Sequence, residues 1–212
     1  GILGEKTGYY SFTGRVVNHL IYANANQGIV IDKAYSSVEL VNNTIYQAVG
    51  DAVLVEDNSQ DVLLRNNILW VDSGFGINVA ADSQQGFDSD FNLIYTSGSG
   101  KSGQWQGVVR PQLNDWRNAA FTDANSFSQD PFFVDISGPD GYIGYVNESN
   151  DGRDDDFHLM SQHGRFTGSL TPVLDAGTGL PMFLSSTEIT DAQQSPAIDR
   201  GDASYPFTEE PS

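Results

Sequence analysis

Residues 38–60 read VELVNNTIYQAVGDAVLVEDNSQ, and residues 61–83 read DVLLRNNILWVDSGFGINVAADS. Both stretches place an Asn pair, an aromatic residue and a second hydrophobic run at matching positions. Asn67 follows Asn43 by 24 residues, Asn92 follows Asn67 by 25, and His19 precedes Asn43 by 24. Several columns that share one period are the signature of a repeat fold.

Within one repeat the hydrophobic pattern has a period of two, as in Val38-Glu39-Leu40, so the repeat consists of short strands separated by turns. Three strands in about 24 residues are too few to bury a face alone. Stacking one repeat on the next pairs like strand with like strand at ~4.8 Å and closes a continuous core. The sequence therefore predicts an all-β parallel solenoid with about 24 residues per rung.

The repeat also predicts which side chains face inward and which turn residues stack. Asn tolerates left-handed backbone angles and bonds nearby main chain, so we expect Asn42 with Asn66, and Asn43 with Asn67 and Asn92, to bond along the stack. The inward set should be Val38, Leu40, Ile45, Val53 and Val55, with Val62, Leu64, Leu69, Ile77 and Val79 in the next rung.

These columns resemble the right-handed parallel β-helix superfamily, the pectate-lyase-like solenoids of bacterial extracellular proteins. Downstream, LNDWRNAAFTDANSFSQDPFFVD, DDDFHLMSQHGRF and SPAIDRGD resemble the C-terminal part of bacterial surface β-helix proteins. Together the matches cover roughly residues 14–95 and 111–202. The resemblance implies a right-handed, single-stranded parallel β-helix in the extracellular space or on a bacterial cell surface. It does not imply one chemistry, because the superfamily includes lyases, hydrolases, epimerases and proteins without known activity.

Three segments are expected. Residues 1–95 form β-helix rungs that begin inside a strand without a cap, so we expect them to continue from upstream rungs of a longer protein. Residues 96–127 form a Gly/Ser-rich loop and one short helix, near 111–120, packed on the solenoid flank. Residues 128–212 add C-terminal β-helix strands with long acidic and irregular loops.

Composition excludes several function classes. The 212 residues include 28 acidic and 10 basic ones, a formal net charge of −18, which argues against nucleic acid as a partner. No apolar run approaches the roughly 20 residues of a membrane span. Cysteine is absent, so neither a disulfide framework nor a thiolate metal site can form. No nucleophile-elbow, P-loop or dinucleotide motif is present.

The first candidate site is the outward face of the strand that begins each rung. In pectate-lyase-like enzymes this face binds polysaccharide, carboxylates hold calcium on the uronate, and a basic residue takes the C5 proton. By that resemblance Arg65, Asp88 and Asp90 are the catalytic candidates, with Arg15 and Glu39 as ligand-binding neighbours. The alternative is a charged surface ladder that pairs across rungs. The whole face is Arg15, Val17, Glu39, Val41, Leu63, Arg65, Asp88 and Asp90.

The second candidate is the aromatic column Tyr22, Tyr46, Trp70 and Tyr95. Tyr46 and Trp70 would bind sugar rings if the column formed a flat platform. The alternative is packing beneath residues 96–127, which contribute three aromatic residues of their own, Trp105, Trp116 and Phe121.

The third candidate is the acidic loop GPDGYIGYVNESNDGRDDDF. Within it, Asn147, Ser149, Asp151 and Gly152 resemble the start of an EF-hand loop, but His158 stands at position twelve, where that motif requires Glu. A looser Ca²⁺ site is expected, against the alternative of a solvated turn. Its ligands would come from Asp140, Asp151, Asp154, Asp155 and Asp156.

Two functions follow from these features. The first is a non-catalytic region of a secreted or surface-attached protein that binds polysaccharide or acts as a rigid spacer. The second is part of a lyase, epimerase or glycoside hydrolase that acts on acidic polysaccharide.

Overall fold

The computed structural model describes residues 1–5, 12–166, 176–178 and 188–205. They form two compact units, one of residues up to 129 together with 199–205, and one of residues 130–198. Among the described residues, no helix is long and apolar enough to cross a membrane.

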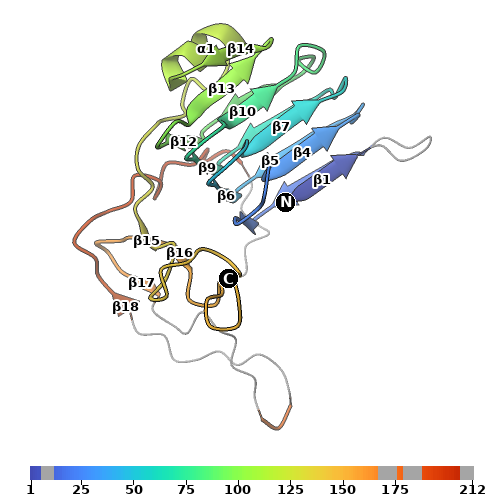
Figure 1. The fold of residues 1–212 in the computed structure, drawn as a ribbon. Coiled ribbons are helices and arrows are strands. Elements are labelled where there is room, and N and C mark those ends of the chain that lie inside the picture. The colour runs from blue at the N-terminus through green and yellow to red at the C-terminus, as the bar shows by residue number, and fades with distance from the viewer. Residues whose placement is uncertain (6–11, 167–175, 179–187, 206–212) are drawn as a thin grey trace. The chain divides into compact units, whose positions relative to one another are not determined.

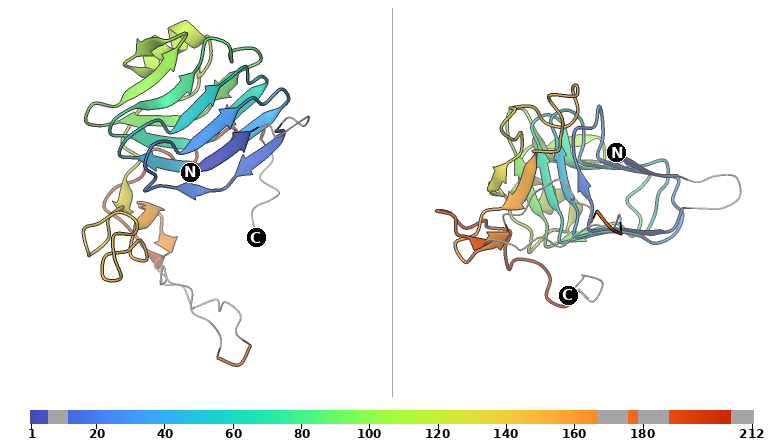
Figure 2. Two further views of the ribbon diagram at one scale, coloured as in Figure 1. Left: turned by 45° about the vertical axis from the view of Figure 1, so that its right-hand side comes forward. Right: turned by 90° about the horizontal axis from the view of Figure 1, so that it is seen from below.

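The first unit is a solenoid with three walls, each built from strands of successive coils that pair in parallel, and β13 and β14 extend only the first wall (Figure 1). Figure 2 shows the coils one above another on the left, and superposed when viewed from below on the right. Sheet 1 contains β1 (Ile2–Glu5), β4 (Ile29–Asp32), β7 (Val53–Glu56), β10 (Phe75–Val79), β13 (Lys101–Trp105) and β14 (Val108–Arg110). Sheet 2 contains β2 (Gly14–Val17), β5 (Val38–Val41), β8 (Val62–Arg65) and β11 (Asp88–Asp90). Sheet 3 contains β3 (Leu20–Ile21), β6 (Thr44–Gln47), β9 (Ile68–Val71) and β12 (Leu93–Thr96).

The strand register confirms the repeat derived from the sequence. Val38 pairs with Val62 in sheet 2, and Ile45 pairs with Leu69 in sheet 3. All ten residues expected to face inward are buried and belong to one hydrophobic cluster. Each such side chain contributes roughly 1.5–3 kcal/mol on burial.

Asn43, Asn67 and Asn92, at the turns between sheets 2 and 3, bond along the stack as expected, whereas the Oδ1 of Asn66 accepts a hydrogen bond from the backbone N–H of Asp202. Asn42 and Asn66 adopt left-handed angles, with φ of 55° and 58°. The amide oxygen of Asn67 accepts hydrogen bonds from the backbone N–H of Asn43 and from its side-chain Nδ2, both at 3.0 Å. Asn92 Oδ1 accepts the same pair of bonds from Asn67, both at 2.9 Å. This buried ladder satisfies the turn N–H groups that the strands leave unpaired.

Glycine is required where coils touch at the turn before sheet 1. Gly50 has a φ of +90°, and a Cβ there would lie 1.4 Å from the backbone oxygen of Asn26 in the coil below. Gly74, at the equivalent turn, has a φ of +113°. Any larger residue would force these two turns apart.

The expectation for residues 96–127 needs correction, because part of that segment is a further rung. Strand β13 pairs in parallel with β10, with Val79 opposite Trp105. One of the glycines that suggested a loop, Gly103, is required by side-chain packing. A Cβ at Gly103 would lie 2.4 Å from the Trp116 ring of helix α1 (Leu113–Ala120).

Helix α1 forms where the sequence predicted a helix, but it covers the end of the solenoid core instead of its flank. Trp116 is fully buried and packs edge-on against Trp105, with ring centroids 5.6 Å apart. Strand β14 lies antiparallel on β13 beside the helix. The last coil therefore has its apolar interior closed by aromatic side chains.

The prediction of further β-helix strands in residues 128–212 is wrong for the described part of that segment. Strands β15 (Phe133–Asp135) and β16 (Asp156–Leu159) pair antiparallel, as do β17 (Arg165–Phe166) and β18 (Glu188–Ile189). Antiparallel strands can be joined by a loop that turns straight back, whereas parallel rungs need a crossover to the next coil. The acidic loop between β15 and β16 returns the chain in this way.

Candidate functional site

The outer face of sheet 2 carries the residues proposed for catalysis. Its register forms two rows across the coils, one through Arg15, Glu39, Leu63 and Asp88, and one through Val17, Val41, Arg65 and Asp90. Arg65 and Asp88 belong to neighbouring coils and meet diagonally. The structure thus brings the catalytic candidates Arg65, Asp88 and Asp90 together on one face. Of the residues expected on this face, Val41 is buried instead.

The charged side chains of this face pair with one another. Arg15 Nε lies 2.9 Å from Glu39 Oε2, and Arg65 Nη2 lies 2.5 Å from Asp88 Oδ2. Arg65 Nη1 also donates to the backbone oxygen of Leu64 at 2.9 Å. This is the charged ladder that the sequence left open as an alternative.

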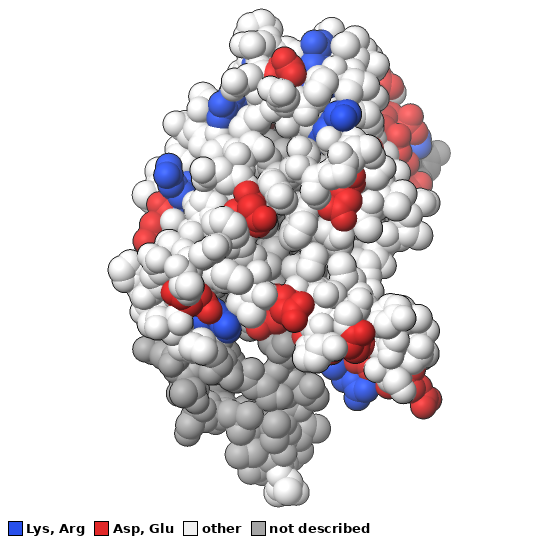
Figure 3. Space-filling view, turned by 60° about the vertical axis from the view of Figure 1, so that its left-hand side comes forward, with Lys and Arg blue, Asp and Glu red and all other residues white. Residues whose placement is uncertain are grey.

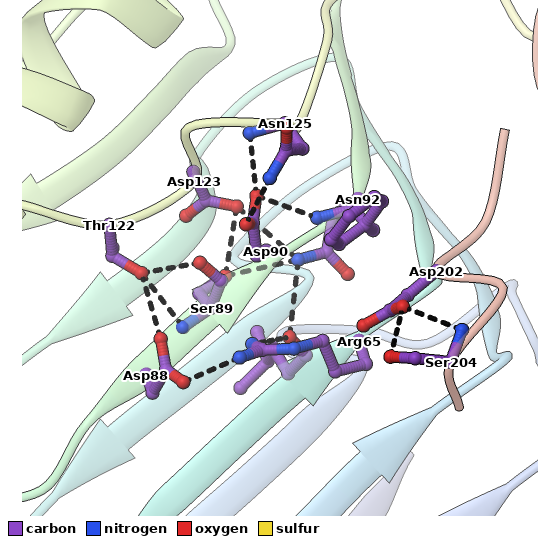
Figure 4. Close-up of polar contacts among 12 residues, drawn as sticks. Arg65, Asp88, Ser89, Asp90, Asn92, Thr122, Asp123, Asn125, Asp202 and Ser204 are labelled. Atoms are coloured by element: carbon purple, nitrogen blue, oxygen red, sulfur yellow. Dashed lines mark hydrogen bonds and ion pairs between the residues drawn. The ribbon is translucent and has the colours of Figure 1, made fainter. Parts of the chain in front are cut away.

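Asp90 has a structural partner of a different kind. Its Oδ1 accepts a hydrogen bond from the backbone N–H of Asn125 at 2.7 Å, and its Oδ2 accepts one from Asn125 Nδ2 at 2.8 Å. Thr122 Oγ1 donates to Asp88 Oδ1 at 3.3 Å. Both carboxylates therefore hold residues 122–125 against the last coil (Figure 4).

A segment far along the chain returns to the same face, and the sequence pattern gave no signal for it. The backbone N–H of Asp202 donates to Asn66 Oδ1 at 2.7 Å, and the hydroxyl of Tyr205 donates to Glu39 Oε2 at 2.9 Å. We call residues 199–205 the return segment. It crosses at least two coils and bonds to the side chains of Asn66 and Glu39, which are then not available to a ligand on this face.

The aromatic column forms in sheet 3, but its rings do not make a flat platform. Tyr46 and Trp70 have centroids 4.9 Å apart at an interplanar angle of 71°, and Trp70 and Tyr95 are 5.4 Å apart at 60°. Tyr46 is buried, and its hydroxyl donates to Asp72 Oδ2 at 2.6 Å. Burial, together with that bond, raises the pKa of Tyr46. Such edge-on geometry is typical of packing.

The aromatic residues expected to cover this column lie elsewhere. Trp105 and Trp116 belong to the closed end of the core, and Phe121 is 93% exposed. Trp70 Nε1 instead donates to Ser97 Oγ at 2.8 Å.

In the second unit, three of the five proposed calcium ligands line one hollow of about 240 Å³, namely Asp140, Asp151 and Asp154, together with Ser149 and Arg153. Asp151 Oδ2 pairs with Arg153 Nη2 at 2.5 Å, and this guanidinium lowers the pKa of Asp151. The hollow thus already contains a positive charge, and this charge is paired with one of the proposed ligands.

The other two proposed calcium ligands point to different partners. Asp155 Oδ2 accepts a hydrogen bond from the backbone N–H of Gly144 at 2.7 Å, and Asp156 Oδ1 lies 2.7 Å from His158 Nδ1. Across the described ranges, no three His, Asp or Glu side chains converge as metal ligands. The residues present therefore do not form a Ca²⁺ cage in this arrangement.

A groove that the sequence did not indicate lies in the first unit beside α1. It has a volume of about 390 Å³. Arg117 contributes its only charged side chain, and the remaining lining residues are Thr96, Ser102, Pro111, Gln112, Leu113, Asn114, Phe127 and Ser128.

Comparison with known proteins agrees with the coils. Residues 8–94 match the family model described as right handed beta helix region. Neither the curated proteins nor the solved structures gave a match. The matched residues end within β12, in the last coil that contributes a strand to sheet 3. Within the matched range, the described residues 12–94 form a parallel β-solenoid, and together with the family match this identifies them as a right-handed β-helix region.

Proposed function

We propose that this chain is a non-catalytic β-helix module, a rigid solenoid associated with carbohydrate on a bacterial surface or in the extracellular space. The observation that carries the proposal is the pairing of the candidate catalytic side chains. Arg65 is bound to Asp88, and Asp90 is bound to Asn125. These groups hold the coils and the following chain in place.

A lyase or epimerase would need a free base on this face. Removal of a proton beside a uronate carboxylate requires a base in its unprotonated form within reach of the substrate. The side chain of Arg65 is only 14% exposed, and its guanidinium is paired with the Asp88 carboxylate. Glu39 accepts from Tyr205 of the return segment and pairs with Arg15.

A spacer role fits the construction of the solenoid. Each coil advances the axis by ~4.8 Å and repeats the same side-chain contacts, so stiffness accumulates with coil number. Among the described strands, β1, β2 and β3 each stand at one end of their sheets. The proposal includes upstream rungs that would pair with these edges.

The test is an assay for turnover with uronate polymers, polygalacturonate and alginate, in the presence and absence of added Ca²⁺. We expect no release of unsaturated or reducing ends. Arg65→Ala should reduce stability by about 1 kcal/mol, the scale of a partly exposed ion pair. Glu148→Ala, at an exposed position in the acidic loop, is the control and should change stability little. Product release by the wild type that disappears in Arg65→Ala would establish an enzyme instead.

A further inference from the structure

The groove beside α1 has the dimensions of a small-ligand site. Its volume of about 390 Å³ lies within the roughly 300–1,000 Å³ typical of such sites. The walls come from the end of β12, from β13, from the first turns of α1 and from residues 127–128, all within the first unit. The site is thus assembled from four separate parts of the chain.

The lining combines hydroxyl and amide groups with apolar surface. Thr96, Ser102 and Ser128 contribute hydroxyls, and Gln112 and Asn114 contribute amides. Leu113, Phe127 and Pro111 contribute carbon surface. A sugar ring presents this same mixture, since its hydroxyls need partners while its C–H faces pack on apolar groups.

Arg117 gives the groove a positive charge, and among the described residues it forms no ion pair with a carboxylate. Its Nε donates to the backbone oxygen of Asp123 at 2.6 Å, Nη1 donates to Asn114 Oδ1 at 3.2 Å, and Nη2 donates to the backbone oxygen of Ser126. These three acceptors are uncharged. A guanidinium has five N–H groups, so two remain for another partner.

The same end of the solenoid gathers other cations without acidic partners. Within the described part of the chain, Lys101, Arg110 and Arg200 make no ion pair with a carboxylate, and the Nε of Arg110 is buried without a hydrogen bond. Arg200 lies over the Phe127 ring, 5.7 Å from its centroid. In Figure 3, several Lys and Arg side chains lie near the top, the end at which Figure 1 draws α1 and β14, with Asp and Glu side chains between them.

This distribution is informative because the protein is strongly acidic. With a net charge of −18, carboxylates are abundant, and Arg15 and Arg65 on sheet 2 are both paired with them. The cations beside the groove are left for an anion from outside. A guanidinium can hold a carboxylate through two parallel N–H···O bonds, and its single positive charge balances the single negative charge of that carboxylate.

We propose that the groove beside α1 binds the carboxylate-bearing ring of an acidic sugar, with Arg117 on the carboxylate and Asn114 and Thr96 on ring hydroxyls. This inference rests on the proposed carbohydrate association and places it at the closed end of the solenoid, away from sheet 2. No bond is made or broken in the groove.

Titration calorimetry of the full chain with galacturonic acid tests the proposal. We expect measurable binding that falls about tenfold in Arg117→Lys, which keeps the charge but loses the two-pronged contact. Asn114→Ala, at an exposed position, should weaken binding severalfold without loss of thermal stability. Arg65→Gln, which removes an equal charge from sheet 2, is the matched control and should bind as the wild type does.

Galactose, inorganic phosphate and sulfate complete the experiment. Galactose should bind at least tenfold more weakly than galacturonic acid, because it lacks the carboxylate. Equal binding of phosphate or sulfate would overturn the sugar assignment, and binding lost equally in Arg65→Gln would overturn the location. No binding of galacturonic acid would reject the groove while leaving the non-catalytic solenoid standing, since that proposal fails only if turnover is found.

Discussion

The Asn ladder is the feature whose removal should cost the solenoid most for its size. In Asn67→Ala, four hydrogen bonds disappear, two accepted by Oδ1 and two donated by Nδ2 to Leu40 O and Asn92 Oδ1. Asn67 is 2% exposed, so water cannot replace them without entering the core. At about 1 kcal/mol for each bond, the free energy of unfolding should fall by about 4 kcal/mol.

Urea unfolding followed by tryptophan fluorescence measures this loss, and thermal unfolding should show a decrease in Tm of about 10 °C. Asn118→Ala is the matched control, because Asn118 is exposed on α1 and should change stability by less than about 0.5 kcal/mol. If Asn67→Ala costs no more than Asn118→Ala, the ladder does not hold the coils together and the reasoning is refuted.

Three further perturbations address the turns, the buried charge and the return segment. Gly50→Ala should prevent normal stacking, because the new Cβ would collide with the backbone of Asn26. The control is Gly107→Ala, with a φ of +71° and open space around it, which should cost about 1 kcal/mol of stability. Circular dichroism and urea midpoints compare the two variants, and equal losses of stability would contradict the close approach of the coils at Gly50. Burial raises the pKa of Asp51, so the wild type loses stability as pH rises from about 4 through the raised value. Asp51→Asn lacks this loss, and its advantage in urea midpoint should grow across that window and then level off; an advantage independent of pH would show that the carboxyl is not perturbed. Tyr205→Phe removes the hydroxyl bond of the return segment, and trypsin should then cut after Arg200 roughly three to ten times faster, while an unchanged rate would mean that this bond does not restrain the segment.

The sequence period predicted the coils because each rung must present the next with equivalent groups. Inward residues such as Leu40 and Leu64, and the ladder from Asn43 to Asn92, follow from that one constraint. Strand β13 departs from it, because the Trp116 ring leaves no room for a Cβ at Gly103, and glycine weakens the strand pattern in the sequence. Local pattern cannot reveal a side-chain packing partner that lies on another element.

The candidate sites were predicted less completely than the coils, because their side-chain contacts also join residues from different elements. Alternation placed Arg65 and Asp88 on one face, but the register sets Asp90 opposite Arg65, and only the side-chain geometry shows that Arg65 pairs diagonally with Asp88. The contact of Tyr205 with Glu39 spans 166 residues and has no periodic signal. The groove around Arg117 depends on how α1 meets β13, which no repeat encodes.

Site-specific cross-linking tests the stacking of coils most directly. Because the sequence contains no cysteine, only the introduced cysteines can form a disulfide. Val30 and Leu54 are partners in sheet 1, on neighbouring strands expected ~4.8 Å apart, within disulfide reach. The pair Val30→Cys with Leu54→Cys should oxidise readily to an intramolecular disulfide. The pair Val30→Cys with Glu56→Cys, two residues out of register and about 8 Å apart, should not. Faster cross-linking of the second pair, or none in the first, would contradict the stacked coils.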